Sequence, residues 1–196
     1  MERLDIVDET GEPTGETVER TQAHRLGVRH RTSHVWLLRR GQQGIEVLLQ
    51  KRSDDKDSFP GCYDISSAGH IPAGQGFVES ALRELQEELG VLARPEQLHL
   101  CGQRSFSLDA VFHGLPFHDR QVSNVYALWY DAPAESFTVQ QSEISMVRWM
   151  ELSACMEMVL RGSPSNCIYS EELAMLERYL AKDAVRPGAK EKQTRA

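Results

Sequence analysis

Residues 69–91, GHIPAGQGFVESALRELQEELGV, contain the strongest structural pattern of the chain. The spacing of their apolar residues predicts a helix from Phe77 to Leu89, and Gly90 supplies the left-handed residue that commonly ends a helix. The apolar side chains that this helix would bury on one face are Val78, Ala81, Leu82, Leu85 and Leu89.

Three glutamates, Glu84, Glu87 and Glu88, lie on the same predicted helix at positions i, i+3 and i+4. Residues at this spacing are neighbours on a helix surface, and like charges there repel. We therefore expect a divalent cation to compensate them, and carboxylate oxygens favour Mg²⁺ or Mn²⁺. Arg83 is adjacent and can orient or screen the carboxylates. On the residues alone, a solvated acidic helix face is the alternative.

The segment resembles the signature of the Nudix hydrolases, G-x5-E-x7-R-E-U-x-E-E-x-G-U, where U is a bulky aliphatic residue. One position departs: Gln75 stands where the family usually has glutamate, so an acceptor is kept but a charge is lost. Glu79, one turn further on, is a candidate substitute. The matching residues are Gly69, Arg83, Glu84, Leu85, Glu87, Glu88, Gly90 and Val91.

The resemblance implies an α/β fold, the Nudix α/β/α sandwich with a mixed sheet, and a metal-dependent reaction. By position, Glu84 and Glu88 would bind Mg²⁺, or alternatively Mn²⁺, and Glu87 would support a metal or a bound water. Arg83 and Gly69 would orient the site. The general base varies within the family, and Glu87 and Glu143 are both candidates here.

The residues before this segment resemble a narrower group, the Nudix proteins similar to isopentenyl-diphosphate isomerase. In the isomerases, positions matching Arg52 and Lys56 hold the diphosphate, and positions near His24, His30 and His70 ligate a metal. We therefore predict substrate-binding roles for Arg52, Lys56, His30 and His70. The isomerases also need a cysteine directly before the Gly-His pair, where this chain has Ala68, so isomerase activity is the less favoured alternative. The stretches that carry this resemblance are 24, 30–36, 52–61 and 66–70.

The rest of the chain is predicted to complete one domain with two appendages. Alternating residues around a Gly-Pro turn predict an N-terminal hairpin over 1–23, the Nudix domain would occupy 24–182, and a tail without apolar periodicity, 183–196, is expected to be disordered. Within the domain we expect strands at 35–38, 45–49, 63–68, 98–108, 122–130 and 144–150, and helices at 155–161 and 170–180.

Composition excludes several classes of protein. The 196 residues are 40% hydrophobic and carry a net charge of −7, which disfavours a general binder of nucleic acid polymers. The longest apolar runs are far too short to span a membrane, and no basic leader is visible, which predicts a cytoplasmic protein. The four cysteines form no C-x-x-C pair, so free thiols are expected. The charge is uneven, however, because 24–60 is basic and 69–91 is acidic.

Together these patterns predict a Mg²⁺-dependent hydrolase that cleaves a diphosphate linkage in a small molecule of the nucleoside-diphosphate or prenyl-diphosphate type. The alternatives are isomerase-like activity and a weakly catalytic, diphosphate-binding regulatory protein, the latter suggested by Gln75. The resemblance is compatible with a homodimer, because Nudix proteins of this kind are often dimers, and the sequence identifies neither the oligomeric state nor the substrate.

Overall fold

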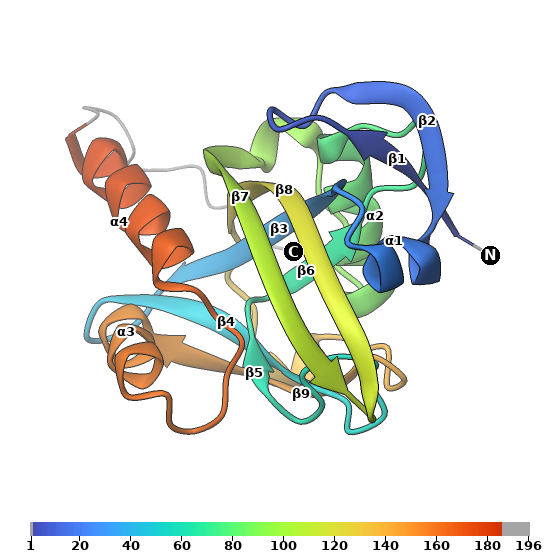
Figure 1. Ribbon diagram of the computed structural model, residues 1–196. Coiled ribbons are helices and arrows are strands. Elements are labelled where there is room, and N and C mark those ends of the chain that lie inside the picture. The colour runs from blue at the N-terminus through green and yellow to red at the C-terminus, as the bar shows by residue number, and fades with distance from the viewer. Residues whose placement is uncertain (1, 186–196) are drawn as a thin grey trace.

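A computed structural model describes residues 2–185 and shows a mixed sheet enclosed by helices (Figure 1). Five strands follow the order β5-β4-β3-β8-β7, β6 pairs with β3 and β9 pairs with β4. β3 and β8 are parallel, and all other pairs are antiparallel. The sheet strands are β3 (His30–Arg40), β4 (Ile45–Arg52), β5 (Tyr63–Asp64), β6 (Ser67–His70), β7 (His99–Phe112), β8 (Leu115–Trp129) and β9 (Ile144–Glu151).

The central strand β3 explains why helices cover both faces of the sheet. Successive strand residues point to opposite faces, so Val35 and Leu37 face one side while Trp36 and Leu38 face the other. Helix α2 (Phe77–Leu89) packs its leucines against the first pair. Helices α3 (Leu152–Arg161) and α4 (Ser170–Val185) pack against the second pair. The predicted α/β sandwich with a mixed sheet is confirmed.

The N-terminal hairpin is also confirmed, as β1 (Arg3–Val7) paired with β2 (Pro13–Glu19). A helix that the sequence did not predict follows it: α1 (Arg20–Leu26) ends at Gly27 in the left-handed conformation. Its seven residues bury only Ala23, so they carry no apolar periodicity by which to recognise a helix. The predicted boundary between hairpin and domain, 23/24, falls inside α1.

Several predicted strand boundaries were wrong, beginning with β3, which starts at His30 and not at residue 35, and β4, which ends at Arg52 and not at residue 49. The expected strand 63–68 is two strands, because the Ser66 hydroxyl donates to Leu48 O (2.6 Å) and accepts from Leu37 N (2.8 Å) where β4 and β3 diverge. The expected strands 98–108 and 122–130 are longer and form one hairpin, β7–β8, whose turn is formed by His113 and Gly114, both with positive φ. The polar residues near the tip of this hairpin hid the strand pattern, so the sequence did not predict that the two strands continue to a shared turn.

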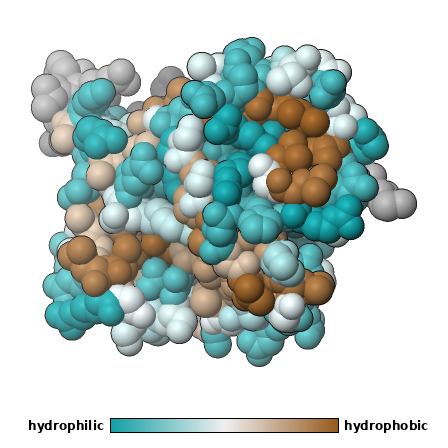
Figure 2. Space-filling model, viewed as in Figure 1, coloured by the Kyte–Doolittle hydropathy of each residue, from teal (hydrophilic) through white to brown (hydrophobic). Residues whose placement is uncertain are grey.

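The C-terminal helix passes beyond its predicted end at residue 180. Helix α4 continues to Val185, so the first three residues of the expected tail 183–196 are helical, and residues 186–196 lie outside the described part. Among the described residues, no helix has the length and apolar character to cross a membrane. Figure 2 shows a mainly hydrophilic face with separate apolar patches, the largest of them at the upper right, around the N-terminal hairpin. Smaller patches lie at α3, where Leu160 is exposed, and near the tip of β7–β8, where Val111 and Leu115 are exposed.

Candidate functional site

Helix α2 holds its carboxylates against strand β6 through a glycine. A Cβ added at Gly69 would lie 2.2 Å from Glu84 Cδ, so no larger residue fits at this position while Glu84 keeps its place. Arg83 pairs with Glu84 (Nη2 to Oε1, 2.8 Å) and with Glu87 (Nη1 to Oε2, 3.3 Å), and donates to His70 O (3.3 Å). The orienting roles predicted for Arg83 and Gly69 therefore correspond to direct contacts with the carboxylates.

The three glutamates differ sharply in exposure. Glu87 has a side chain that is 54% exposed, Glu84 is 14% exposed, and Glu88 is a buried residue. Burial raises the pKa of Glu88 to about 8 and also raises the pKa of Glu84. Within the described residues, Glu88 Oε2 is buried without a hydrogen-bond partner. A buried carboxylate with a free oxygen beside a second carboxylate fits a divalent cation, which would supply the missing positive charge.

Lys56 and Glu143 come together at the same place, from loops that are far apart in the sequence. Lys56 Nζ forms an ion pair with Glu143 Oε2, and Ser53 N donates to Glu143 O (2.8 Å). Both charged groups act electrostatically on Glu88. The structure therefore groups the predicted diphosphate ligand, one predicted general base and a predicted metal ligand.

Arg52 is near these groups but is already engaged. Its Nη1 lies 3.1 Å from Asp64 Oδ2 and its Nε donates to Ser58 O at 3.1 Å. Its side chain is 14% exposed. A diphosphate would therefore meet an Arg52 that shares its guanidinium with Asp64.

A second cluster consists of His24 from α1, His30 from β3 and His70 from β6. One ligand atom from each lies within 4.8 Å of the others. Val28 O can only accept, so His30 Nδ1 donates to it (2.9 Å) and Nε2 presents a lone pair to the cluster. Burial lowers the pKa of His24 to about 3 and of His30 to about 4, and that of His70 well below its usual value. Three neutral imidazoles of this kind can ligate a metal.

Asp119 of β8 completes the surroundings of the histidines. Its Oδ1 lies 3.6 Å from His30 Nε2 and 3.8 Å from His24 Nε2, and burial raises its pKa to about 6. Neither Asp119 Oδ1 nor His30 Nε2 has a hydrogen-bond partner within the described residues. The parallel pairing of β3 with β8 brings them together, because His30 pairs with Gln121, two residues after Asp119.

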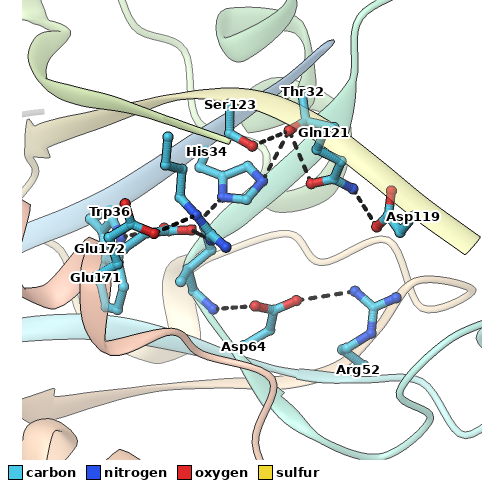
Figure 3. A network of polar contacts seen from close by, with 12 residues as sticks. Thr32, His34, Trp36, Arg52, Asp64, Asp119, Gln121, Ser123, Glu171 and Glu172 are labelled. Carbon is cyan, nitrogen blue, oxygen red and sulfur yellow. Dashed lines mark hydrogen bonds and ion pairs between the residues drawn. The ribbon is translucent and has the colours of Figure 1, made fainter. Parts of the chain in front are cut away.

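A cavity of about 110 Å³ lies beside β6, and its lining includes Arg52, His70 and Asp119 but not the glutamates of α2. Figure 3 shows its polar wall, where Thr32 contacts Gln121 (3.3 Å) and Glu172 contacts His34 (2.8 Å). Arg104 also pairs with Glu172 (2.5 Å), which is buried at the start of α4. The sequence analysis missed Arg104 and Glu172, because neither belongs to a local motif.

The NUDIX domain family model matches residues 28–166. Curated relatives include Nudix hydrolase 3 of Arabidopsis thaliana, 37% identical over 171 residues, and an uncharacterized Nudix hydrolase of Clostridium acetobutylicum, 36% identical over 143 residues. These alignments cover 86% and 73% of this chain. The chain belongs to the Nudix family. It spans only 22% of the Arabidopsis protein and 66% of the Clostridium protein.

Solved structures agree with this fold. The crystal structure of DR0079 from Deinococcus radiodurans is 26% identical, has a TM-score of 0.64, and the match covers 91% of this chain and 98% of that one. The NUDIX domain of Shewanella oneidensis NrtR, solved with ADP ribose, is 18% identical, has a TM-score of 0.55, and the match covers 76% and 87% of the two chains. The latter likeness shows the fold alone.

Proposed function

We propose that this chain is a hydrolase of phosphoanhydride bonds that depends on Mg²⁺, or alternatively on Mn²⁺, and acts on a small molecule containing a diphosphate. The observation that carries the proposal is Glu88, a buried carboxylate with an unpartnered oxygen, held next to Glu84 on α2. Burial raises the pKa of Glu88 more than Ser67 and Lys56 lower it, and a divalent cation would stabilise the ionised carboxylate.

Glu84 and Glu88 would hold the metal, with Glu87 supporting it from the more exposed edge of the helix. When bound, such a metal polarises a phosphoryl oxygen and lowers the pKa of a bound water. Arg83 keeps Glu84 and Glu87 in place through its two ion pairs. These are the roles that the family resemblance implies for this helix.

Lys56 and Glu143 divide the remaining work between binding and proton transfer. Their ion pair supports a role for Lys56 on the diphosphate and for Glu143 as a base, because an incoming anion would attract Lys56 and leave the carboxylate available. Glu87 is the other candidate base. Arg52 would contribute to binding of the diphosphate while it stays paired with Asp64.

The substrate would be a nucleoside-diphosphate or prenyl-diphosphate compound, and not a nucleic acid polymer. The NrtR domain was solved with ADP ribose, a compound of the nucleoside type. A cytoplasmic homodimer without membrane attachment remains the prediction for the whole protein.

A substrate screen tests the proposal. Purified protein with Mg²⁺ is incubated with nucleotide sugars, dinucleoside polyphosphates, nucleoside triphosphates and prenyl diphosphates, and products are identified. We expect release of phosphate or of a monophosphate from at least one compound, and Glu88→Gln should abolish that release. Absence of turnover throughout the screen, or the same turnover in the variant, would contradict the proposal.

The histidine cluster favours a second candidate, isomerase-like activity on a prenyl diphosphate. In the isomerases that this chain resembles, positions near His24, His30 and His70 ligate a metal. In this chain, one ligand atom of each of these histidines lies within 4.8 Å of the others. Ala68 stands where those enzymes need a cysteine, which counts against it. Incubating a prenyl diphosphate in deuterated water distinguishes the two: an isomerase exchanges protons at carbon without releasing phosphate.

A third candidate is a weakly catalytic regulatory protein that binds a diphosphate, for which Gln75 is the supporting feature. It predicts tight binding of a diphosphate compound in calorimetry together with negligible release of phosphate. Restored turnover in Gln75→Glu would support this candidate.

A further inference from the structure

The N-terminal hairpin lies against the loop that leads into the carboxylate helix. Leu4 forms an isolated bridge with Pro72, and Ala73 N donates to Arg3 O at 2.8 Å. Leu4 is fully buried. The hairpin is therefore packed onto residues 71–76 of the Nudix signature, and its first strand is fixed there by backbone contacts.

Asp5 makes the charged contacts in this junction. Its Oδ2 accepts from Gly74 N at 2.9 Å and from Arg31 Nη2 at 2.8 Å. Both side chains are largely buried, at 13% exposure for Asp5 and 10% for Arg31. At such exposure, water screens the attraction between the two charges less than it does at the surface.

Arg31 extends the contact to the first residue of the helix. Its Nη2 also donates to Gln75 O (3.1 Å), and its guanidinium carbon lies 5.4 Å from the centre of the Phe77 ring. Asp5 thus holds Gly74 directly and the next residues through Arg31. Gly74 has a φ of +79°, a conformation that needs such fixing contacts because glycine is free to leave it.

The junction contains the one position where the signature is not matched. The Gln75 side chain is neutral, and its Oε1 only accepts from Ser80 Oγ at 3.4 Å. Asp5 brings a carboxylate to the same loop from a different strand. Glu2 and Arg20 stand immediately before and after the hairpin and are paired at 3.2 Å. The charges of both residues act on the pKa of Glu84.

We infer that Asp5 is a positioning residue for the carboxylates of α2, acting through Arg31 and loop 71–76. The inference rests on the proposed function in one respect, namely that these carboxylates bind a divalent cation. A metal site requires its ligands within tenths of an ångström, and loop 71–76 sets where the helix begins. Loosening the loop should therefore weaken the cation site without removing any ligand.

The test compares Asp5→Asn with the matched variant Asp8→Asn in the same hairpin. Asp8 accepts from Thr10 N (2.8 Å) and Glu12 N (3.1 Å) in the β-turn and does not contact the loop. We measure Mg²⁺ binding by calorimetry without substrate, and the Mg²⁺ concentration that gives half-maximal turnover. Partners outside the ligand shell typically change metal affinity about 10–100-fold, so Asp5→Asn should weaken Mg²⁺ binding by about 10-fold or more and Asp8→Asn by less than about 2-fold.

At saturating Mg²⁺, kcat of Asp5→Asn should return to within about 2-fold of the wild type, since the ligands themselves are intact. Arg31→Lys keeps the charge but loses the fork geometry, and should give an intermediate loss of Mg²⁺ affinity even if Asp5→Asn folds poorly. Equal Mg²⁺ affinity in wild type, Asp5→Asn and Arg31→Lys would overturn the inference, as would an equal loss in Asp8→Asn. Weaker Mg²⁺ binding in Asp5→Asn with no turnover by the wild type would instead support the inference and contradict the proposed hydrolase.

Discussion

Within residues 2–185, the carboxylates of α2 and the histidine cluster are two groups that could hold a metal, and they are built in opposite ways. Glu84, Glu87 and Glu88 belong to one helix, whereas His24, His30 and His70 come from a helix and two strands. They meet at β6, where Gly69 contacts Glu84 and the next residue, His70, faces the other histidines. Successive strand residues point to opposite faces, so β6 separates the two groups.

Burial acts on both groups and favours the neutral form in each, with opposite consequences for metal binding. It raises the pKa of Glu88 to about 8, so this ligand must lose a proton before it binds a cation. It lowers the pKa of His24 to about 3 and of His30 to about 4, so these ligands are already unprotonated near neutral pH. A cation at α2 would therefore be sensitive to pH where a cation at the histidines would not.

The largest expected effect comes from Glu88→Gln. The substitution preserves shape but removes the buried carboxylate, so Mg²⁺ binding should be lost in calorimetry and turnover should fall by more than about 100-fold, beyond what outer contacts typically contribute. Glu96→Gln, at an exposed glutamate that follows α2 in the chain, is the control and should change turnover by less than about 2-fold. If Glu88→Gln keeps Mg²⁺-dependent turnover near the wild-type rate, Glu88 does not bind the metal on which turnover depends.

His30→Gln should separate the second group from the first. Imidazole ligands suit transition metals such as Zn²⁺ and Co²⁺, so we expect the variant to bind Co²⁺ at least about 10-fold more weakly and to lose the visible absorption of a histidine-bound ion. The kcat of Mg²⁺-dependent hydrolysis should change by less than about 3-fold, and a raised KM would support the substrate-binding role predicted for His30. His99→Gln, on β7 and stacked on Tyr179, is the control. If His30→Gln abolishes hydrolysis as Glu88→Gln does, the two groups form a single catalytic centre.

Without metal, the pH dependence of thermal stability should report the burial of both the histidine cluster and the α2 carboxylates. The unfolded state binds more protons than the folded state between the lowered pKa values of His24 and His30, about 3 and 4, and their ordinary value of 6.5, so these residues make stability fall with acid. Between 4.5 and about 8 the folded state binds the extra proton at Glu88, so this residue makes stability fall as pH rises.

Above pH 6.5 His24 and His30 are neutral in both the folded and the unfolded state, so only Glu88 among these residues still changes the free energy of unfolding with pH. We therefore expect the unfolding midpoint to decline by a few degrees towards pH 8. Glu88→Gln should lack this decline, and Mg²⁺ should stabilise the wild type more at pH 8 than at pH 6. A midpoint that rises from pH 6.5 to 8, or a decline that persists unchanged in Glu88→Gln, would show that Glu88 is not buried as a neutral acid.

The smallest effect is expected from Gln75→Glu. The Gln75 side chain contacts Ser80 and its carbonyl is held by Arg31, so a carboxylate there adds charge to a loop that Asp5 already anchors. We expect Mg²⁺ affinity to change by less than about 3-fold, in line with surface substitutions. A gain of about 10-fold or more in Mg²⁺ affinity and in turnover would indicate that the natural glutamine weakens the cation site. Position 75 would then belong to the same functional group as the carboxylates of α2.

The parts of the fold that could be predicted are those with local periodicity. Helix α2 and its boundaries at Phe77 and Leu89 follow from apolar spacing and from Gly90, and the structure has the same limits. Helix α1 could not be recognised, because seven mainly exposed residues bear no pattern, yet it delivers His24. The extended hairpin β7–β8 was also missed at its tip, although this hairpin carries Arg104 and Asp119.

The sequence by itself determined the face on which Glu84, Glu87 and Glu88 stand and the placing of Arg83 beside them, because residue spacing on a helix is a local property. The tertiary structure alone decided which of these glutamates is buried and that His24, His30 and His70 meet. It also decided that Asp5 reaches the loop where Gln75 replaces a glutamate. The physical reason is that burial and long-range contacts depend on how the elements pack, which no spacing along the chain records.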